Sequence, residues 1–138
     1  MSAPPLQAST RTRRLLGWLC ALVWLGAFAA THAPPGDVPN VGPSDKVLHF
    51  AGYAALATPL MLLLAARGRP GRHRAAITIG VLLAYAALDE LTQPIVGRDA
   101  DILDWLCDIA GAATSVVVWE IIFAVRRRRR AEANRSEP

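Results

Sequence analysis

Ionisable and polar side chains recur in this chain as three spaced motifs inside otherwise apolar segments. Histidine titrates near neutral pH, and crowded carboxylates in a low dielectric hold protons more tightly, so these residue types suit acid–base chemistry or polar ligand binding. For catalysis, the candidates are His49 with Glu90 or Asp104 as acid and base. The candidate ligand-binding residues are Asp45, Lys46, His49, Tyr53, Glu90, Gln93, Arg98, Asp104 and Asp108.

A metal ion at these motifs would use His49 and carboxylate oxygens, a ligand set that suits Mg²⁺, Mn²⁺ or Ca²⁺ better than a closed zinc site. The carboxylates available are those of Asp45, Glu90, Asp104 and Asp108. No spacing motif supplies two ligands at once, so the sequence assigns no metal and leaves any cofactor unknown. A phosphate would use Lys46, His49 and Arg98, although acidic residues outnumber the cations around the motifs.

Four apolar segments carry the motifs, at roughly residues 15–31, 47–66, 75–93 and 105–125. Each is close to the roughly 20 residues that cross a bilayer core of about 30 Å. The chain has 138 residues, of which 53% are hydrophobic, which is enough for one domain. We therefore expect an all-α membrane protein, a four-helix bundle built from two helical hairpins.

Cationic residues are gathered in alternate connections between these segments. Thirteen of the fifteen lysines and arginines precede the first segment, join the second to the third, or follow the fourth. Under the positive-inside rule, this distribution places both termini in the cytoplasm. The motifs then lie on the outer side, at one depth in three different segments. Because a charge at the centre of a membrane helix costs about 2.5 to 3.5 kcal/mol, we expect their side chains to converge rather than face lipid.

The expected organisation has three parts: a disordered basic N-terminus at residues 1–14, a membrane domain at 15–125 and a basic cytoplasmic tail at 126–138. The polar end of that tail, from residue 131, is expected to be disordered. The arginine run at 126–130 directly follows an apolar segment, so we expect it to meet anionic lipid rather than nucleic acid. Alternatively, the N-terminal segment is a cleaved signal peptide, which would leave three membrane spans.

The order of the motifs resembles the VanZ-like family of small bacterial membrane proteins. The corresponding sequences are Asp-Lys-x-x-His-Phe, Glu-x-x-Gln and Gly-Arg-x5-Asp-x3-Asp-x2-Gly, and the resemblance covers the core motif region at residues 44–118. The chain departs from the family pattern where Asp108 replaces a common Asn and where Pro94 follows Gln93. The resemblance implies a multi-pass protein of the bacterial inner membrane. The family is named for a member that gives low-level resistance to the glycopeptide teicoplanin, and it brings no established reaction.

These observations leave several functions open. The leading hypothesis is a cell-envelope protein whose outward-facing pocket binds a lipid-linked or cell-wall-related ligand and so modifies glycopeptide susceptibility. Its expected partners are membrane lipids and such a precursor, with no nucleic acid. One alternative is a membrane hydrolase or transferase acting on a lipid phosphate, and another is a small proton-coupled carrier, which would need a homodimer. A purely structural interpretation, in which the charges neutralise one another to hold the bundle together, also remains.

Overall fold

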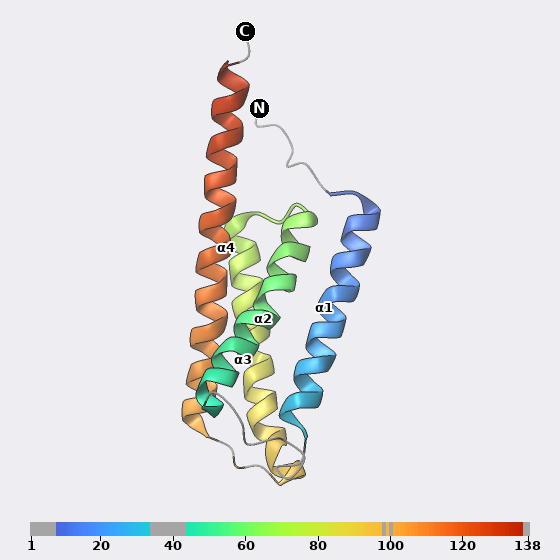
Figure 1. Cartoon of the computed structure of the whole chain (residues 1–138), viewed down its shortest axis with the longest axis vertical. Coiled ribbons are helices and arrows are strands. Elements are labelled where there is room, and N and C mark those ends of the chain that lie inside the picture. The colour runs from blue at the N-terminus through green and yellow to red at the C-terminus, as the bar shows by residue number, and fades with distance from the viewer. Residues whose placement is uncertain (1–7, 34–43, 98, 100, 137–138) are drawn as a thin grey trace.

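A computed structural model describes residues 8–33, 44–97, 99 and 101–136 of the chain. Within these residues it is all-α and contains no β-strand, as the sequence predicts (Figure 1). The elements are α1 (Thr10–Thr31), α2 (Asp45–Ala66), α3 (Gly71–Thr92), the 3-10 helix η2 (Gln93–Val96) and α4 (Ile102–Ser136). In the described residues, four helices are long and apolar enough to cross a membrane, which confirms the expected number of spans.

Two helices are longer than the apolar segments suggest, and this corrects the expected disorder of residues 10–14 and 131–136. Helix α1 begins before the apolar segment because the Ser9 hydroxyl accepts a hydrogen bond from the amide of Thr12 at 3.1 Å, which caps the helix. Helix α4 continues through the arginine run to Ser136. Arginine, alanine and glutamate are good helix formers, so the helix propagates beyond its membrane-spanning part.

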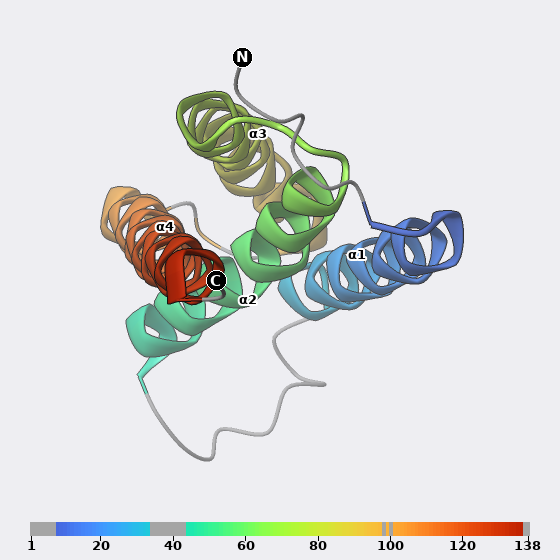
Figure 2. The ribbon, with the colours of Figure 1, turned by 90° about the horizontal axis from the view of Figure 1, so that it is seen from above.

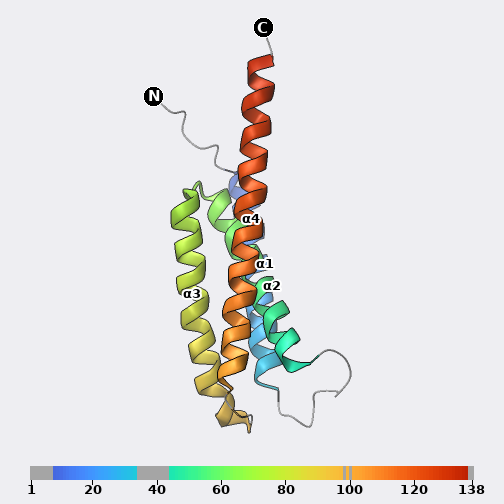
Figure 3. The ribbon, with the colours of Figure 1, turned by 90° about the vertical axis from the view of Figure 1, so that its left-hand side faces the viewer.

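The helices alternate in direction and separate the charges between two ends of the bundle. The start of α1, the connection from α2 to α3 and the end of α4 lie at one end, and the end of α3 and the start of α4 lie at the other (Figures 1 and 3). The first, the arginine-rich end, carries Arg11, Arg13, Arg14, Arg67, Arg69, Arg72 and Arg74. The second, the acidic end, carries Asp45, Asp89, Glu90, Asp99, Asp101, Asp104 and Asp108. Helix α4 extends past the other helices at the arginine-rich end.

Helix α2 lies at the centre of the bundle and contacts α1, α3 and α4 (Figure 2). Its most extensive contact is with α4, which is not its neighbour in the chain. The buried core is formed by Tyr53, Leu56, Ala57, Leu82, Ala86 and Ala112, from α2, α3 and α4. Helices that are adjacent in the sequence therefore pack against each other as hairpins, but the most extensive helix contact in the bundle is between α2 and α4.

The close approach of α2 and α4 depends on small residues in α4. A Cβ atom added to Gly111 would overlap the backbone carbonyl oxygen of Phe50 and lie 3.0 Å from its Cα. One turn further along, the Ser115 hydroxyl lies 3.1 Å from that of Thr58. Small residues of this kind allow membrane helices to bring their backbones together. This contact brings His49, which precedes Phe50, toward Asp108, one turn before Gly111.

Helix α1 packs on the outside of the bundle and has no buried residue along its described length. Val23, Trp24 and Ala27 pack against the core, and the Trp24 indole donates to the carbonyl oxygen of Leu56 at 3.4 Å. Large apolar side chains on its other faces are exposed, including Trp18 at 71%. Apolar side chains all round a helix suit a surface that meets lipid.

Candidate functional site

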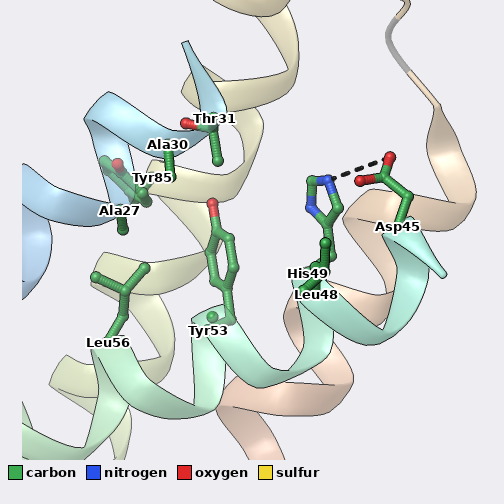
Figure 4. A pocket seen from close by; sticks show the side chains of 10 residues that line it. Ala27, Ala30, Thr31, Asp45, Leu48, His49, Tyr53, Leu56 and Tyr85 are labelled. Atoms are coloured by element: carbon green, nitrogen blue, oxygen red, sulfur yellow. Dashed lines mark ion pairs between the residues drawn. The ribbon is translucent and has the colours of Figure 1, made fainter. Parts of the chain in front are cut away.

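His49 and Asp108 form a buried pair between α2 and α4. The imidazole Nδ1 lies 2.9 Å from Asp108 Oδ1, and the two side chains are 5% and 0% exposed. An ionised carboxylate only accepts hydrogen bonds, so in that state Nδ1 carries the proton and the ring is held in one tautomer. The other nitrogen, Nε2, lies 3.9 Å from Asp45 Oδ2, one helical turn away (Figure 4).

Glu90 of α3 completes a cluster of three residues from three helices. One oxygen of its buried carboxyl group, Oε2, accepts a hydrogen bond from the backbone amide of Asp101 at 3.0 Å. Within the described residues, Glu90 Oε1 and Asp108 Oδ2 are buried and have no hydrogen-bond partner. One ligand atom each of His49, Glu90 and Asp108 lies within 4.8 Å of the others. The expected convergence of three helices on one site is therefore present.

Lys46 is directed to a different pair of carboxylates at the edge of the acidic end. Its ammonium group donates to Asp101 Oδ2 at 2.9 Å and to Asp104 Oδ1 at 3.2 Å. The hydrogen bond from Lys46, with a second from the amide of Leu103, lowers the pKa of Asp101 below its usual value. Of the residues expected in the site, Lys46 and Asp104 are therefore paired with each other and with Asp101.

A second polar cluster joins α1 to α3, and sequence reasoning missed most of it. Buried Asp89 accepts a hydrogen bond from the Thr31 hydroxyl at 2.7 Å, and its Oδ1 lies 3.7 Å from Nδ1 of His32. The Gln93 amide donates to Asp89 Oδ2 at 3.4 Å, so Gln93 lies beside Asp89. The sequence does contain a feature that indicates this cluster, because Asp89 is a second carboxylate next to Glu90, deep in an apolar segment. The sequence did not predict a role for His32, because it lies just beyond the first apolar segment, at residues 15–31.

Arg98, which the sequence predicts as a ligand-binding residue, lies outside the described residues. Six of the remaining expected residues form two groups, whereas Gln93 lies beside Asp89 and Tyr53 lines the cavity described below. His49, Glu90 and Asp108 come together in the buried cluster, with Asp45 beside His49. Lys46 and Asp104 are paired at the edge.

A cavity of about 270 Å³ opens beside His49, between α1 and α2, with one residue from α3. Its lining residues are Ala27, Ala30, Thr31, Asp45, Leu48, His49, Gly52, Tyr53, Leu56 and Tyr85. Most of this wall is apolar. The Tyr53 ring lies between His49 and Leu56, with its hydroxyl toward Ala30 and Thr31 (Figure 4). Among the described residues, neither Tyr53 nor Tyr85 has a hydrogen-bond partner for its buried hydroxyl. The cavity therefore offers polar groups on an apolar wall.

The family of this chain follows from a match to a family model described as VanZ/LLP1, which covers residues 7–123. The chain belongs to the VanZ/LLP1 family. The match includes α1 and all three motifs, which confirms the resemblance noted in the sequence. With four helices in the described residues that can span a bilayer, this VanZ/LLP1 protein is a multi-pass membrane protein. No curated protein and no solved structure matches the chain.

Proposed function

We propose that this VanZ/LLP1 protein binds a lipid-linked, cell-wall-related ligand in the cavity beside His49, and so modifies susceptibility to glycopeptides of the teicoplanin type. The protein works in the bacterial inner membrane, with the arginine-rich end in the cytoplasm and the acidic end outside. The positive-inside rule supports this orientation, because thirteen of the fifteen lysines and arginines precede the first apolar segment, join the second to the third, or follow the fourth. Glycopeptides act on cell-wall precursors outside the membrane, which is where the cavity opens.

The observation that carries this proposal is the two-part lining of the cavity. Ala27 and Ala30 of α1 and Leu48 and Leu56 of α2 provide an apolar wall at membrane depth, which suits a hydrocarbon chain. The hydroxyls of Tyr53 and Tyr85 and the His49 ring provide groups that can bond a polar headgroup. A volume of about 270 Å³ accommodates only the part of a lipid where chain and headgroup join, so the remaining chain would lie between the lipids.

Thermal stability in detergent tests ligand binding directly. We expect polyprenyl phosphate to raise the melting temperature of the wild-type protein, because a ligand that binds only the folded state at 100 times its Kd adds about 2.7 kcal/mol. His49→Ala and Tyr53→Phe should each reduce this increase. His73→Ala is the matched control, since His73 is exposed at the arginine-rich end. If polyprenyl phosphate leaves the wild-type melting temperature unchanged, this ligand class is wrong.

The buried His49–Asp108 pair favours a second function, a hydrolase or transferase acting on a lipid phosphate. A histidine oriented by a carboxylate is a common general base. In the structure this carboxylate is Asp108, whereas the Asp104 carboxylate is hydrogen-bonded to Lys46. Release of inorganic phosphate from polyprenyl diphosphate, abolished in His49→Ala and kept in His73→Ala, would establish this activity. Equal release by both variants would exclude His49 as the base.

A further inference from the structure

The geometry points to a binding site for one divalent transition-metal cation, Zn²⁺ or Mn²⁺, formed by His49, Glu90 and Asp108. This site lies behind the wall of the cavity and goes beyond the proposed ligand binding. The sequence includes all three among the possible metal ligands but assigns no metal, because each helix supplies only one of the three residues. Folding is what brings the ligands together.

The first argument is the position and type of the three side chains. All three residues are buried, with whole-residue exposures of 6% for His49, 8% for Glu90 and 0% for Asp108, and one ligand atom of each lies within 4.8 Å of the others. Metal–ligand bonds of about 2.0 to 2.2 Å place neighbouring ligand atoms roughly 3 to 3.6 Å apart, so side-chain movements of about 1 to 2 Å at most would close the site. One imidazole nitrogen and two carboxylate oxygens are ligands that Zn²⁺ and Mn²⁺ accept. A cation bound to Nδ1 would replace the proton that this nitrogen shares with Asp108, and that proton would move to Nε2 or be released to solvent.

The second argument is independent of the clustering and concerns two oxygens without partners. Glu90 Oε1 and Asp108 Oδ2 are buried, and neither finds a hydrogen-bond donor in the described part of the chain. A buried polar atom without a partner carries a large desolvation penalty, so native proteins almost always satisfy such atoms. A cation bound between the two carboxylates would satisfy both oxygens at once.

The third argument is the balance of charge. Among the described residues, two carboxylates share this buried site with a single imidazole, and Asp104 and Asp45 lie close to the same histidine. Lys46 does not neutralise the cluster, because its ammonium group is hydrogen-bonded to Asp101 and Asp104. Burying carboxylates without a compensating cation is strongly unfavourable, and a divalent ion would balance the pair.

A second group of possible ligands, Asp45, His49 and Asp104, shares the histidine. It is the weaker candidate, because Asp45 is exposed and Asp104 accepts a hydrogen bond from Lys46. In the buried site, three protein ligands leave positions open on the cation. If the proposed function is also correct, an open position facing the cavity could take a headgroup oxygen, which would let this acidic end bind a phosphate.

Metal binding can be measured on the full-length protein in detergent, without any lipid. The purified protein is stripped with a chelator, and binding is followed by calorimetry for Zn²⁺ and by electron paramagnetic resonance for Mn²⁺. We expect one ion per chain. Glu90→Gln and Asp108→Asn should each lower the affinity at least tenfold, since even changes to residues that only support a ligand cost about 10- to 100-fold. Asp99→Asn, an exposed aspartate at the same end, is the matched control and should bind like wild type.

The wild-type protein also gives a readout that does not depend on the folding of a variant. Cu²⁺ bound in the site should show hyperfine coupling to one imidazole nitrogen, and this coupling should be unchanged in His73→Ala, which removes an exposed histidine that could bind Cu²⁺ adventitiously. Failure to bind one ion per chain overturns the site, and so does affinity that is equal in wild type, Glu90→Gln and Asp108→Asn. The metal titration contains no lipid, and the lipid titration can be run with a chelator present. Each experiment can therefore contradict its own proposal without contradicting the other.

Discussion

At the scale of single residues, the site is a buried cluster in which His49 of α2 and Asp108 of α4 are 2.9 Å apart and Glu90 of α3 lies beside them. The convergence of His49, Glu90 and Asp108 follows from the 1.5 Å rise per residue, which places each at a similar depth in its own span. The partner of each residue depends on how the helices are rotated and which ones are adjacent. The sequence therefore predicted Glu90 or Asp104 as the acid–base partner of His49, whereas the buried hydrogen-bond partner of His49 is Asp108. The cluster around Asp89 was not predicted, because it also depends on which helices are adjacent and how they are rotated.

The ion pair between Lys46 and Asp101 gives a prediction about pH. The hydrogen bond from Lys46 lowers the pKa of Asp101 in the folded protein, so the pair stabilises the fold above the pKa of the unfolded chain, about 3.9 for Asp. This contribution is lost as the pH falls through the lower, folded pKa. Asp101→Asn should therefore have a lower melting temperature than wild type at pH 7, and the difference should shrink toward pH 3.

The matched control for this pH series is Asp99→Asn, which removes an exposed carboxylate from the same connection. Melting temperatures of the three proteins, measured from pH 7 to pH 3, check the prediction. A difference between Asp101→Asn and wild type that is the same at pH 3 as at pH 7 would contradict the role assigned to ionised Asp101.

At the scale of elements, the contact between α2 and α4 determines the geometry of the site. The sequence shows the four spans clearly, because apolar length alone identifies them. It does not show that α2 pairs most closely with α4, because this depends on matching small residues to a backbone in another helix. Gly111 and Ser115 have the spacing typical of such contacts, but only the structure identifies Phe50 and Thr58 as their partners.

Gly111 should therefore be intolerant of even a small side chain. In Gly111→Ala, the new Cβ would overlap the Phe50 carbonyl oxygen, which forces α2 and α4 apart. We expect a loss of about 1 to 3 kcal/mol of stability, the usual cost of overpacking, with weaker ligand binding because His49 and Asp108 separate. Thermal unfolding in detergent and the polyprenyl phosphate titration measure these two effects.

Gly80→Ala is the matched control for the change at Gly111. A Cβ atom at Gly80 meets no other atom within 4 Å, and alanine favours a helix interior over glycine by about 1 kcal/mol. This variant should be as stable as wild type or slightly more stable. If both alanine variants have the same stability, the close approach at Gly111 does not hold the two helices together.

At the scale of the whole molecule, the two ends of the bundle differ in charge and in structure. At the arginine-rich end, the guanidinium of Arg74 forms two hydrogen bonds of 2.9 Å with the Glu120 carboxylate and lies 4.3 Å from the centre of the Phe123 ring. This contact joins α3 to α4 far from the cavity. The long α4 carries its arginine run beyond the bundle, where it can reach anionic lipid headgroups.

The orientation of these ends can be tested by chemical labelling in intact cells. In a background with Cys20 and Cys107 replaced by alanine, a membrane-impermeant maleimide should label Asp99→Cys directly. It should label Arg72→Cys only after the membrane is permeabilised, because the positive-inside rule places that residue in the cytoplasm. The reverse pattern would put the cavity on the cytoplasmic side and exclude precursors outside the membrane as its ligands.

The central claim is that the cavity between α1 and α2 at the acidic end binds a lipid-linked ligand. Photocrosslinking with a light-activated polyprenyl phosphate, followed by mass spectrometry of the modified peptides, tests this most directly. The account predicts crosslinks near Ala30 in α1 and near Leu48 and Leu56 in α2, which excess unlabelled polyprenyl phosphate removes. Crosslinks spread over the exposed face of α3 at Leu88 and Leu91, unaffected by the competitor, would contradict it.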